Sequence, residues 1–169
     1  RPSGATGAAR QARREGTQGG SVKIYVASSW RNHYQPAVVY ELRQRGHDVY
    51  DFRNPAPGDR GFGWRQCATV EQLADPLAFR DEVLTHPIAA RAFALDMGAL
   101  SGADATVLVL PCGRSAHLEL GYATGAGQKT IVLLDNPMSE PELMYLMNHA
   151  ICVSLDEVIA QLAAWETGK

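Results

Sequence analysis

The spacing of apolar and polar positions predicts that strands and helices alternate along most of the chain. Short runs rich in β-branched residues, which are typical of buried strands, lie at 22–27, 48–51, 105–110, 130–134 and 150–153. Apolar residues with helical spacing predict helices over 36–46, 87–100, 115–125, 140–148 and 154–165, with a weaker pattern over 70–84 that Pro76 interrupts. Strands that alternate with helices form a parallel sheet covered on both faces, which predicts the α/β class.

Five strands in a chain of this length fit a doubly wound, flavodoxin-like sheet in the order 2-1-3-4-5. In that order the direction of winding reverses between the first and third strands, and ligands of such folds bind at this switch point. The loop 28–32 after the first strand and the loop 111–117 after the third would face each other there. We therefore expect the site at the carboxyl ends of these two strands.

A carboxylate stands on the apolar face of the helix that follows the third strand. With about 100° per residue, Glu119 lies on the same side as Ala116 and Ala123, which should pack on the sheet. A charged group there is costly unless the protein uses it. The plainer interpretation is a glutamate that only favours the helix N-terminus.

A second carboxylate has the same feature one helix earlier. Asp96 shares its face with Ala92 and Phe93 in the helix predicted over 87–100. Two carboxylates on successive helices therefore point where apolar side chains are expected. A carboxylate pair beside an anion subsite suits cleavage of a glycosidic or N-glycosidic bond, with Glu119 as the nucleophile and Asp96 as the acid or the orienting partner.

The two crevice loops supply the candidate substrate-binding residues. Arg31 and Arg114 lie beside serine hydroxyls and a helix N-terminus that Ser115 is expected to cap, and this combination suits a phosphate or another anion. The expected binding residues are Ser28, Ser29, Trp30, Arg31, Cys112, Gly113, Arg114, Ser115, His117 and Tyr122. The long segment 52–65 carries Phe62 and Trp64 and is expected to form a lid.

Composition and charge narrow the classes of function. The 169 residues carry a net charge of −2, so no attraction to polymeric nucleic acid is expected. Three widely spaced cysteines favour a reducing, cytoplasmic compartment, and no Cys or His pair has zinc-ligand spacing, so neither a metal nor a cofactor is expected. No apolar run is long enough to span a membrane. Residues 1–20 have hardly any large apolar side chain and are expected to be a disordered tail ahead of one domain over 21–169.

Several of these residues carry a resemblance to a known family. The run 107–121, followed by Lys-Thr-Ile-Val at 129–132, resembles the nucleoside 2-deoxyribosyltransferase superfamily, which includes nucleotide N-glycosidases. The family's helical motif matches Glu-Leu-Gly-Tyr-Ala at 119–123. The resemblance implies that Glu119 is the nucleophilic glutamate and that Asp96 matches the family's aspartate in the preceding helix. The opening Ile-Tyr-Val-Ala-Ser-Ser at 24–29 is similar to the family's first strand and sugar-contacting loop.

One departure from the family affects the expected reaction. The loop 111–115 contains no acidic residue, whereas deoxyribosyltransferases commonly carry an aspartate before the glutamate. The departure favours a hydrolase acting on an anionic nucleotide or nucleoside over a transferase. Some bacterial proteins with a similar opening are TIR-like, and this second resemblance makes NAD an alternative substrate.

Other classes of protein stay open as alternatives. Ser115, Asp135 and His149 follow one another in the order of a serine hydrolase triad, although His117 replaces the final glycine of the usual nucleophile motif. A TIR-like signalling or interaction module with a degenerate pocket would instead use 143–147 as a partner surface. The sequence also leaves a homo-oligomer open.

Overall fold

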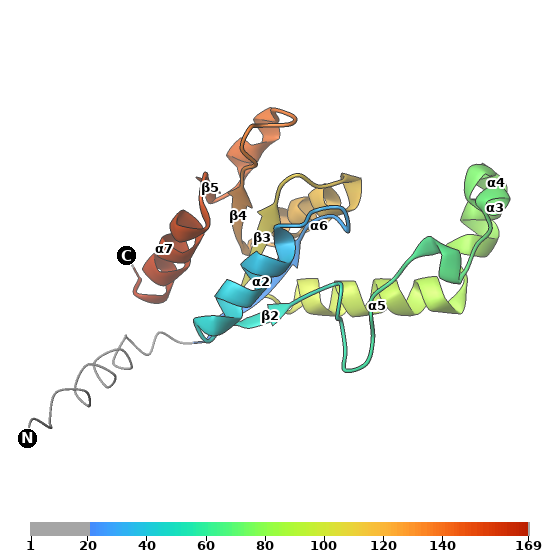
Figure 1. Ribbon diagram of the computed structural model, residues 1–169, viewed down its shortest axis with the longest axis horizontal. Coiled ribbons are helices and arrows are strands. Elements are labelled where there is room, and N and C mark those ends of the chain that lie inside the picture. Colours follow the sequence, from blue (N-terminus) through green and yellow to red (C-terminus); the bar gives the residue numbers. More distant parts are fainter. Residues whose placement is uncertain (1–20, 169) are drawn as a thin grey trace, which may run out of the picture.

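A computed structural model describes residues 21–168, and the prediction of a disordered tail over 1–20 lies outside the described residues. Five parallel strands form one sheet in the order β2-β1-β3-β4-β5. The strands are β1 (Lys23–Ala27), β2 (Asp48–Tyr50), β3 (Ala105–Val109), β4 (Lys129–Leu133) and β5 (Ala150–Cys152) (Figure 1). The predicted class and strand order are therefore confirmed.

Helices cover both faces of the sheet. One face carries α2 (Gln35–Gln44) and α7 (Leu155–Glu166), and the other carries α5 (Pro87–Ser101) and α6 (Arg114–Gly125) (Figure 1). The two helices that bear the predicted carboxylates therefore lie on the same face. Among residues 21–168, no helix combines the length and the apolar character needed to cross a membrane.

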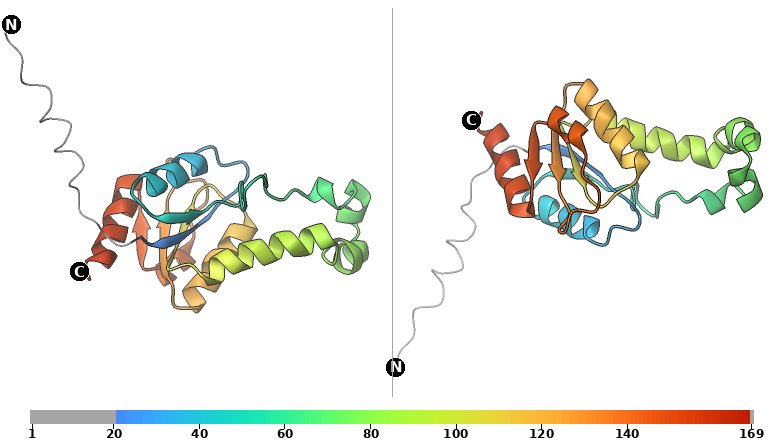
Figure 2. Two further views of the ribbon diagram at one scale, coloured as in Figure 1. Left: turned by 90° about the horizontal axis from the view of Figure 1, so that it is seen from below. Right: turned by 90° about the horizontal axis from the view of Figure 1, so that it is seen from above.

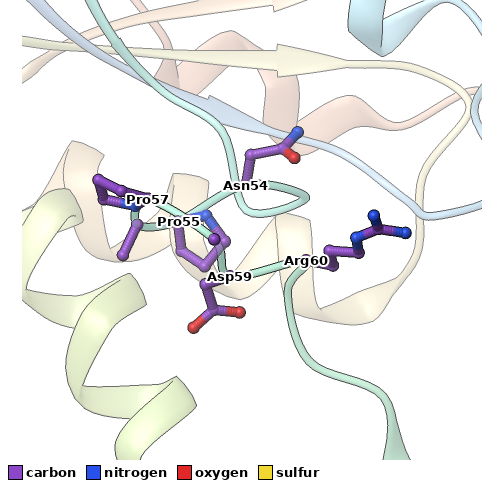
Figure 3. A pocket seen from close by; sticks show the side chains of 7 residues that line it. Asn54, Pro55, Pro57, Asp59 and Arg60 are labelled. Atoms are coloured by element: carbon purple, nitrogen blue, oxygen red, sulfur yellow. The ribbon is translucent and has the colours of Figure 1, made fainter.

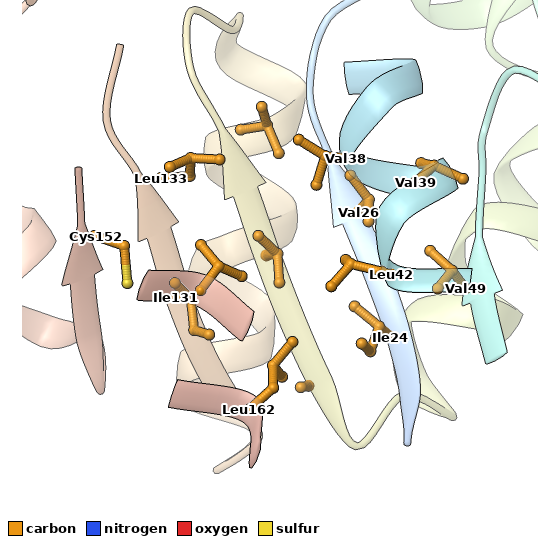
Figure 4. Packing of buried hydrophobic residues seen from close by; sticks show 14 residues of the cluster. Ile24, Val26, Val38, Val39, Leu42, Val49, Ile131, Leu133, Cys152 and Leu162 are labelled. Carbon is orange, nitrogen blue, oxygen red and sulfur yellow. The ribbon is translucent and has the colours of Figure 1, made fainter. Parts of the chain in front are cut away.

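Alternating side chains of the strands fill two hydrophobic cores. Ile24 and Val26 of β1 pack with Leu42 of α2 and Leu162 of α7, and each of the four is at most 1% exposed (Figure 4). Burying one such side chain contributes about 1.5–3 kcal/mol. Because successive strand residues point to opposite faces, Tyr25 lies on the face covered by α5 and α6. This alternation brings a phenol hydroxyl to the same face as the two carboxylates.

The prediction of a helix over 140–148 is wrong. A short 3₁₀ helix, η3 (Leu143–Met147), forms in its place. In η3, Tyr145 is the buried residue, so this segment has no apolar face wide enough for an amphipathic α-helix.

The weak helical pattern over 70–84 is divided at Pro76, as predicted. The pieces are α3 (Val70–Ala74), α4 (Pro76–Ala78) and the π-helical turn η2 (Phe79–Val83), preceded by a 3₁₀ turn, η1 (Trp64–Gln66). Figure 2 shows that α3 and α4 lie at the far end of α5, well beyond the sheet. The molecule is elongated because this segment and α5 project from the sheet together.

The N-terminal half of α5 extends past the end of the sheet (Figure 2). The apolar face of α5 is therefore buried near the C-terminus of the helix and exposed further toward its N-terminus. Leu100 is 1% exposed, whereas Phe93 is 68% exposed. The expectation that Phe93 lies on a buried apolar face is wrong, because no strand reaches that part of the helix. The projecting half of α5 instead forms one wall of a cavity.

Candidate active site

A cavity of about 890 Å³ opens at the carboxyl ends of β1 and β3, between the segment 52–66 and α5. This position is the predicted switch point. The structure brings together, in the lining of the cavity, the predicted residues Ser28, Ser29, Trp30, Arg31, Phe62, Trp64, Asp96, Gly113, Arg114, Ser115 and Glu119.

Three predicted binding residues, Cys112, His117 and Tyr122, lie outside this lining, which corrects the prediction. His117 and Glu119 are two positions apart on α6, so they point about 200° away from each other. Nε2 of His117 contacts the Tyr145 hydroxyl at 2.9 Å, and Sγ of Cys112 lies 3.6 Å from Nδ1 of His117. Burial raises the pKa of Cys112 to about 12. Tyr122 is 43% exposed.

Glu119 and Asp96 reach the cavity from α6 and α5, close enough for their charges to interact. Burial, followed by the charge of Asp96, raises the pKa of Glu119 to about 7, against an opposing effect of Tyr25. Burial also raises the pKa of Asp96, while a hydrogen bond from Tyr50 lowers it. Near pH 7 Glu119 therefore gains or loses a proton, which is typical of groups that act in acid–base or nucleophilic catalysis.

Two tyrosines from neighbouring strands support the carboxylates. The Tyr50 hydroxyl at the end of β2 donates to Oδ1 of Asp96 at 2.7 Å, and the Tyr50 ring stacks on Tyr25 with centroids 5.3 Å apart. Tyr25 is 1% exposed, and its hydroxyl has no hydrogen-bond partner in the described chain. That hydroxyl nevertheless lies beside Glu119 and favours its charged form, lowering its pKa. Each carboxylate is thus accompanied by a phenol.

The loops after β1 and β3 are joined by side chains that bond to backbone carbonyls. Oγ of Ser28 donates to the carbonyl of Val109 at 2.8 Å. Nδ2 of Asn32, a residue only 3% exposed, donates to the carbonyls of Val109 at 3.1 Å and Pro111 at 3.2 Å. These bonds fix the two sides of the cavity relative to each other.

Arg31 and Arg114 supply positive charge at the rim of the cavity. Both are exposed, and neither forms an ion pair within residues 21–168. α6 begins at Arg114 with Gly113 as its N-cap, so the prediction that Ser115 caps the helix is wrong. Because Gly113 has no side chain, no side chain caps the first N–H groups of α6. A helix N-terminus without a side-chain cap, in a cavity that is also lined by two arginines, suits an anion.

The segment 52–66 covers one side of the cavity with aromatic rings. Phe62 and Trp64 meet edge to face with centroids 4.9 Å apart. Gly61 has φ +78°, and a Cβ there would lie 2.7 Å from the Trp30 ring. A larger residue would therefore push this segment away from Trp30. The expected lid residues thus lie over the cavity.

A smaller hollow of about 490 Å³ is formed by residues 54–60 of the same segment (Figure 3). Asp59 points toward α5, where its carboxylate pairs with the Arg91 guanidinium at 3.2 Å, while Arg60 points away (Figure 3). Asp59 and Arg91 also line the larger cavity. The ion pair therefore ties the covering segment to α5, and we assign no separate site to the hollow.

The structure does not assemble the serine hydrolase triad. Ser115 lines the cavity, whereas Asp135 and His149 do not. The His149 ring packs against Trp165, and its Nδ1 lies 3.2 Å from the hydroxyl of Thr130. In the described part of the chain, no group of three or more His, Cys, Asp or Glu side chains could hold a metal ion.

Five residues that support the site were missed by sequence reasoning: Tyr25, Asn32, Tyr50, Arg53 and Arg91. The two tyrosines lie in predicted strands, but only the structure shows that Tyr25 pairs with Tyr50 in the register of β1 and β2. Asn32 and Arg53 act on carbonyl groups of distant or neighbouring loops, and such contacts leave no local pattern. In the sequence Arg91 is an ordinary charged residue of a helix, and only the structure shows that it pairs with Asp59.

No protein-family model and no curated protein sequence matches the chain. A 2-deoxyribosyltransferase from Bacillus psychrosaccharolyticus has a similar structure, with TM-score 0.53 and 22% identity over 80% of this chain and 88% of that one. The chain has the fold of a 2-deoxyribosyltransferase. The resemblance drawn from residues 119–123 is therefore confirmed at the level of the fold.

Two further solved structures are similar. A conserved protein from Enterococcus faecalis V583 has TM-score 0.54 at 15% identity, over 83% of this chain and 96% of that one. The CMP N-glycosidase BcmB from Clostridium botulinum has TM-score 0.46 at 16% identity, over 84% of this chain and 98% of that one.

Replacing Glu119 by Gln should stabilise the protein at alkaline pH. The pKa of Glu119 is raised from 4.5 to about 7, so the folded state binds more protons than the unfolded state in this range. Stability therefore falls as the pH rises through that window. For Glu119→Gln we expect a gain of up to about 3 kcal/mol in the free energy of unfolding at pH 8, vanishing below about pH 4.5.

Urea unfolding at several pH values measures this gain. The matched control is Glu140→Gln, because Glu140 is exposed and far from the cavity lining. A gain for Glu119→Gln that is the same at every pH would contradict the raised pKa.

Proposed function

We propose that the protein is an N-glycosidase that cleaves the bond between the base and the sugar of a nucleotide or nucleoside. The observation that carries the proposal is the pair of partly buried carboxylates, Glu119 and Asp96, at the switch-point cavity with raised pKa values. A carboxylate shielded from water can attack a cationic anomeric carbon, while a second carboxyl group handles the proton of the leaving base.

The rest of the cavity suits a nucleotide. Trp30, Phe62 and Trp64 line it and offer flat apolar surfaces for a base. Arg31 and Arg114 face the same space and carry charges that no described carboxylate neutralises. Aromatic rings on one side and free guanidinium groups on the other match a ligand with a base at one end and a phosphate at the other.

The proposed reaction proceeds in two steps. The reactive form is the singly protonated pair with the proton on Asp96. Ionised Glu119 attacks the anomeric carbon, the C–N bond breaks, and the electron pair of that bond leaves with the base, which takes the proton from Asp96. Water then attacks the anomeric carbon of the ester and gives a proton to Asp96. Cleavage of the ester restores the Glu119 carboxylate and releases the free sugar or sugar phosphate. Tyr50 holds Asp96 throughout through its 2.7 Å hydrogen bond.

Further features support this function over its alternatives. The fold shared with a 2-deoxyribosyltransferase is consistent with chemistry at a base–sugar bond. The loop 111–115 has no acidic residue to manage a second base, which favours water as the acceptor. NAD contains the same type of bond and is the alternative substrate. The three cysteines are free, which supports the proposal of a reducing, cytoplasmic location.

Incubation with nucleoside monophosphates, nucleosides, deoxynucleosides and NAD should release free base from at least one substrate, detected by chromatography. Glu119→Gln should abolish the release, because the amide cannot attack, and Asp96→Asn should slow it about 10²–10⁴-fold. Ser115→Ala should keep most of the activity. Absence of base from every substrate, or full activity of Glu119→Gln, would sink the proposal.

Arg114→Ala should weaken a phosphorylated ligand more than its unphosphorylated counterpart. The lost charge-assisted hydrogen bond predicts roughly a tenfold or greater rise in Kd for the nucleoside monophosphate, with little change for the nucleoside. Titration calorimetry on the Glu119→Gln background measures both without turnover. Equal weakening of the two ligands would contradict a phosphate at this position.

The acidic limb of the pH profile of kcat/KM should report the ionisation of Glu119. Activity needs the carboxylate, so it should fall as the pH drops through about 7. Tyr25→Phe removes the hydroxyl that favours the charged form, which should move this limb to higher pH. An unchanged limb in Tyr25→Phe would show that Tyr25 does not act on Glu119.

A further inference from the structure

Arg53 lies directly after the strand β2 and reaches across to the loop that follows β1. Its Nη2 donates to the carbonyl oxygens of Ser29 at 3.2 Å, Trp30 at 3.0 Å and Asn32 at 2.9 Å. One guanidinium therefore holds three of four consecutive carbonyl groups. The carbonyl and N–H of a trans peptide point in opposite directions, so these bonds also orient the N–H groups of the loop away from Arg53.

The same guanidinium contacts two aromatic rings of the cavity. Its central carbon lies 5.1 Å from the centre of the Trp30 ring and 5.7 Å from that of Phe52. Those two rings meet edge to face with centroids 5.4 Å apart. Trp30 and Phe52 line the cavity, whereas Arg53 does not. Arg53 thus supports the binding surface from behind.

The Arg53 guanidinium has no direct ionic partner in the described chain. It forms no ion pair among residues 21–168, and its buried Nε has no hydrogen-bond partner there. The nearby carboxylate of Asp51 instead accepts from the side chains of Gln35 and Asn54 and from the backbone N–H of Arg53. The guanidinium is thus held by carbonyl dipoles and rings, while the Asp51 carboxylate is bonded to other donors, so no direct ion pair offsets the charge of Arg53 behind the loop.

We propose that Arg53 is the positioning residue of the substrate-binding loop 29–32 and that its charge, which no direct ion pair offsets, makes the loop prefer an anionic ligand. This inference rests on the proposed function, because the preferred ligand is the phosphorylated form of the same substrate. The guanidinium sets the shape of the loop through three carbonyls and the rings, and its positive potential adds to that of Arg31 on the cavity side. If Arg53 only stabilised the fold, its loss would weaken binding of the phosphorylated and the unphosphorylated ligand equally.

Two substitutions separate charge from shape. Arg53→Gln keeps one NH₂ donor without the charge, and Arg53→Lys keeps the charge and three N–H donors but loses the flat face toward the rings. Arg53→Met is a second neutral variant for use where Arg53→Gln does not fold, as judged by circular dichroism. The matched control is Arg45→Met, an exposed arginine at the end of α2 outside the cavity lining.

The first readout is the ratio of kcat/KM for CMP to that for cytidine. The neutral variant should lower this ratio about tenfold or more, Arg53→Lys should stay within about threefold of the parent, and Arg45→Met should leave it unchanged. A ratio unchanged in the neutral variant overturns the proposal, since it shows a purely structural role. Equal losses in Arg53→Lys and the neutral variant overturn it as well.

The second readout is independent of turnover. Calorimetry of CMP and cytidine binding to Glu119→Gln, with and without the neutral substitution at Arg53, should show that the preference for CMP falls with the charge. If the parent releases no base but this preference falls, the proposed reaction fails and the role of Arg53 stands. If base is released and the preference is unchanged, the role of Arg53 fails alone. If Glu119→Gln binds none of the nucleoside monophosphates, CMP included, both fail; where it binds a different one, that nucleotide and its nucleoside replace CMP and cytidine in both readouts.

Discussion

The parallel pairing of β1 with β3 is the constraint on which the rest of the site depends. Four residue pairs from Ile24↔Ala105 to Ala27↔Leu108 set their register, so both strands end at the same level. The chain leaves β1 toward one face of the sheet and β3 toward the other, so the two following loops open a crevice that no helix fills. Asn32 closes this arrangement by bonding to two carbonyls beyond β3.

The two carboxylates are held at an energetic cost. Neither Glu119 nor Asp96 has a basic partner in the described chain, and burial opposes ionisation of both. Interior carboxylates normally acquire such a partner or are replaced by apolar residues. Tyr25 and Tyr50 offset only part of the cost, because a phenol favours a charged carboxylate less than a cation does. The two carboxylates therefore lower the stability of the fold rather than add to it.

Positive charge and aromatic surface are distributed around these carboxylates rather than against them. Arg53 lies behind the loop after β1, and Arg91 is paired with Asp59 across the covering segment. Arg31 and Arg114 remain free at the rim. Because α5 extends beyond the sheet, it can carry a wall of the cavity and an anchor for the covering segment on one helix (Figure 2). The part of α5 that extends past the sheet is therefore also the part that encloses the cavity.

The sequence alone determined the class of fold, the strand order, and the two carboxylates that meet at the cavity. These depend on local periodicity: β-branched runs mark buried strands, and Glu119 and Asp96 stand out because helical spacing places them among apolar residues. Only the tertiary structure decided which polar side chains hold the loops, since Asn32 bonds to carbonyls 77 and 79 residues away. It also decided that Phe93 is exposed, because a helical pattern says which face is apolar but not where the sheet beneath it ends.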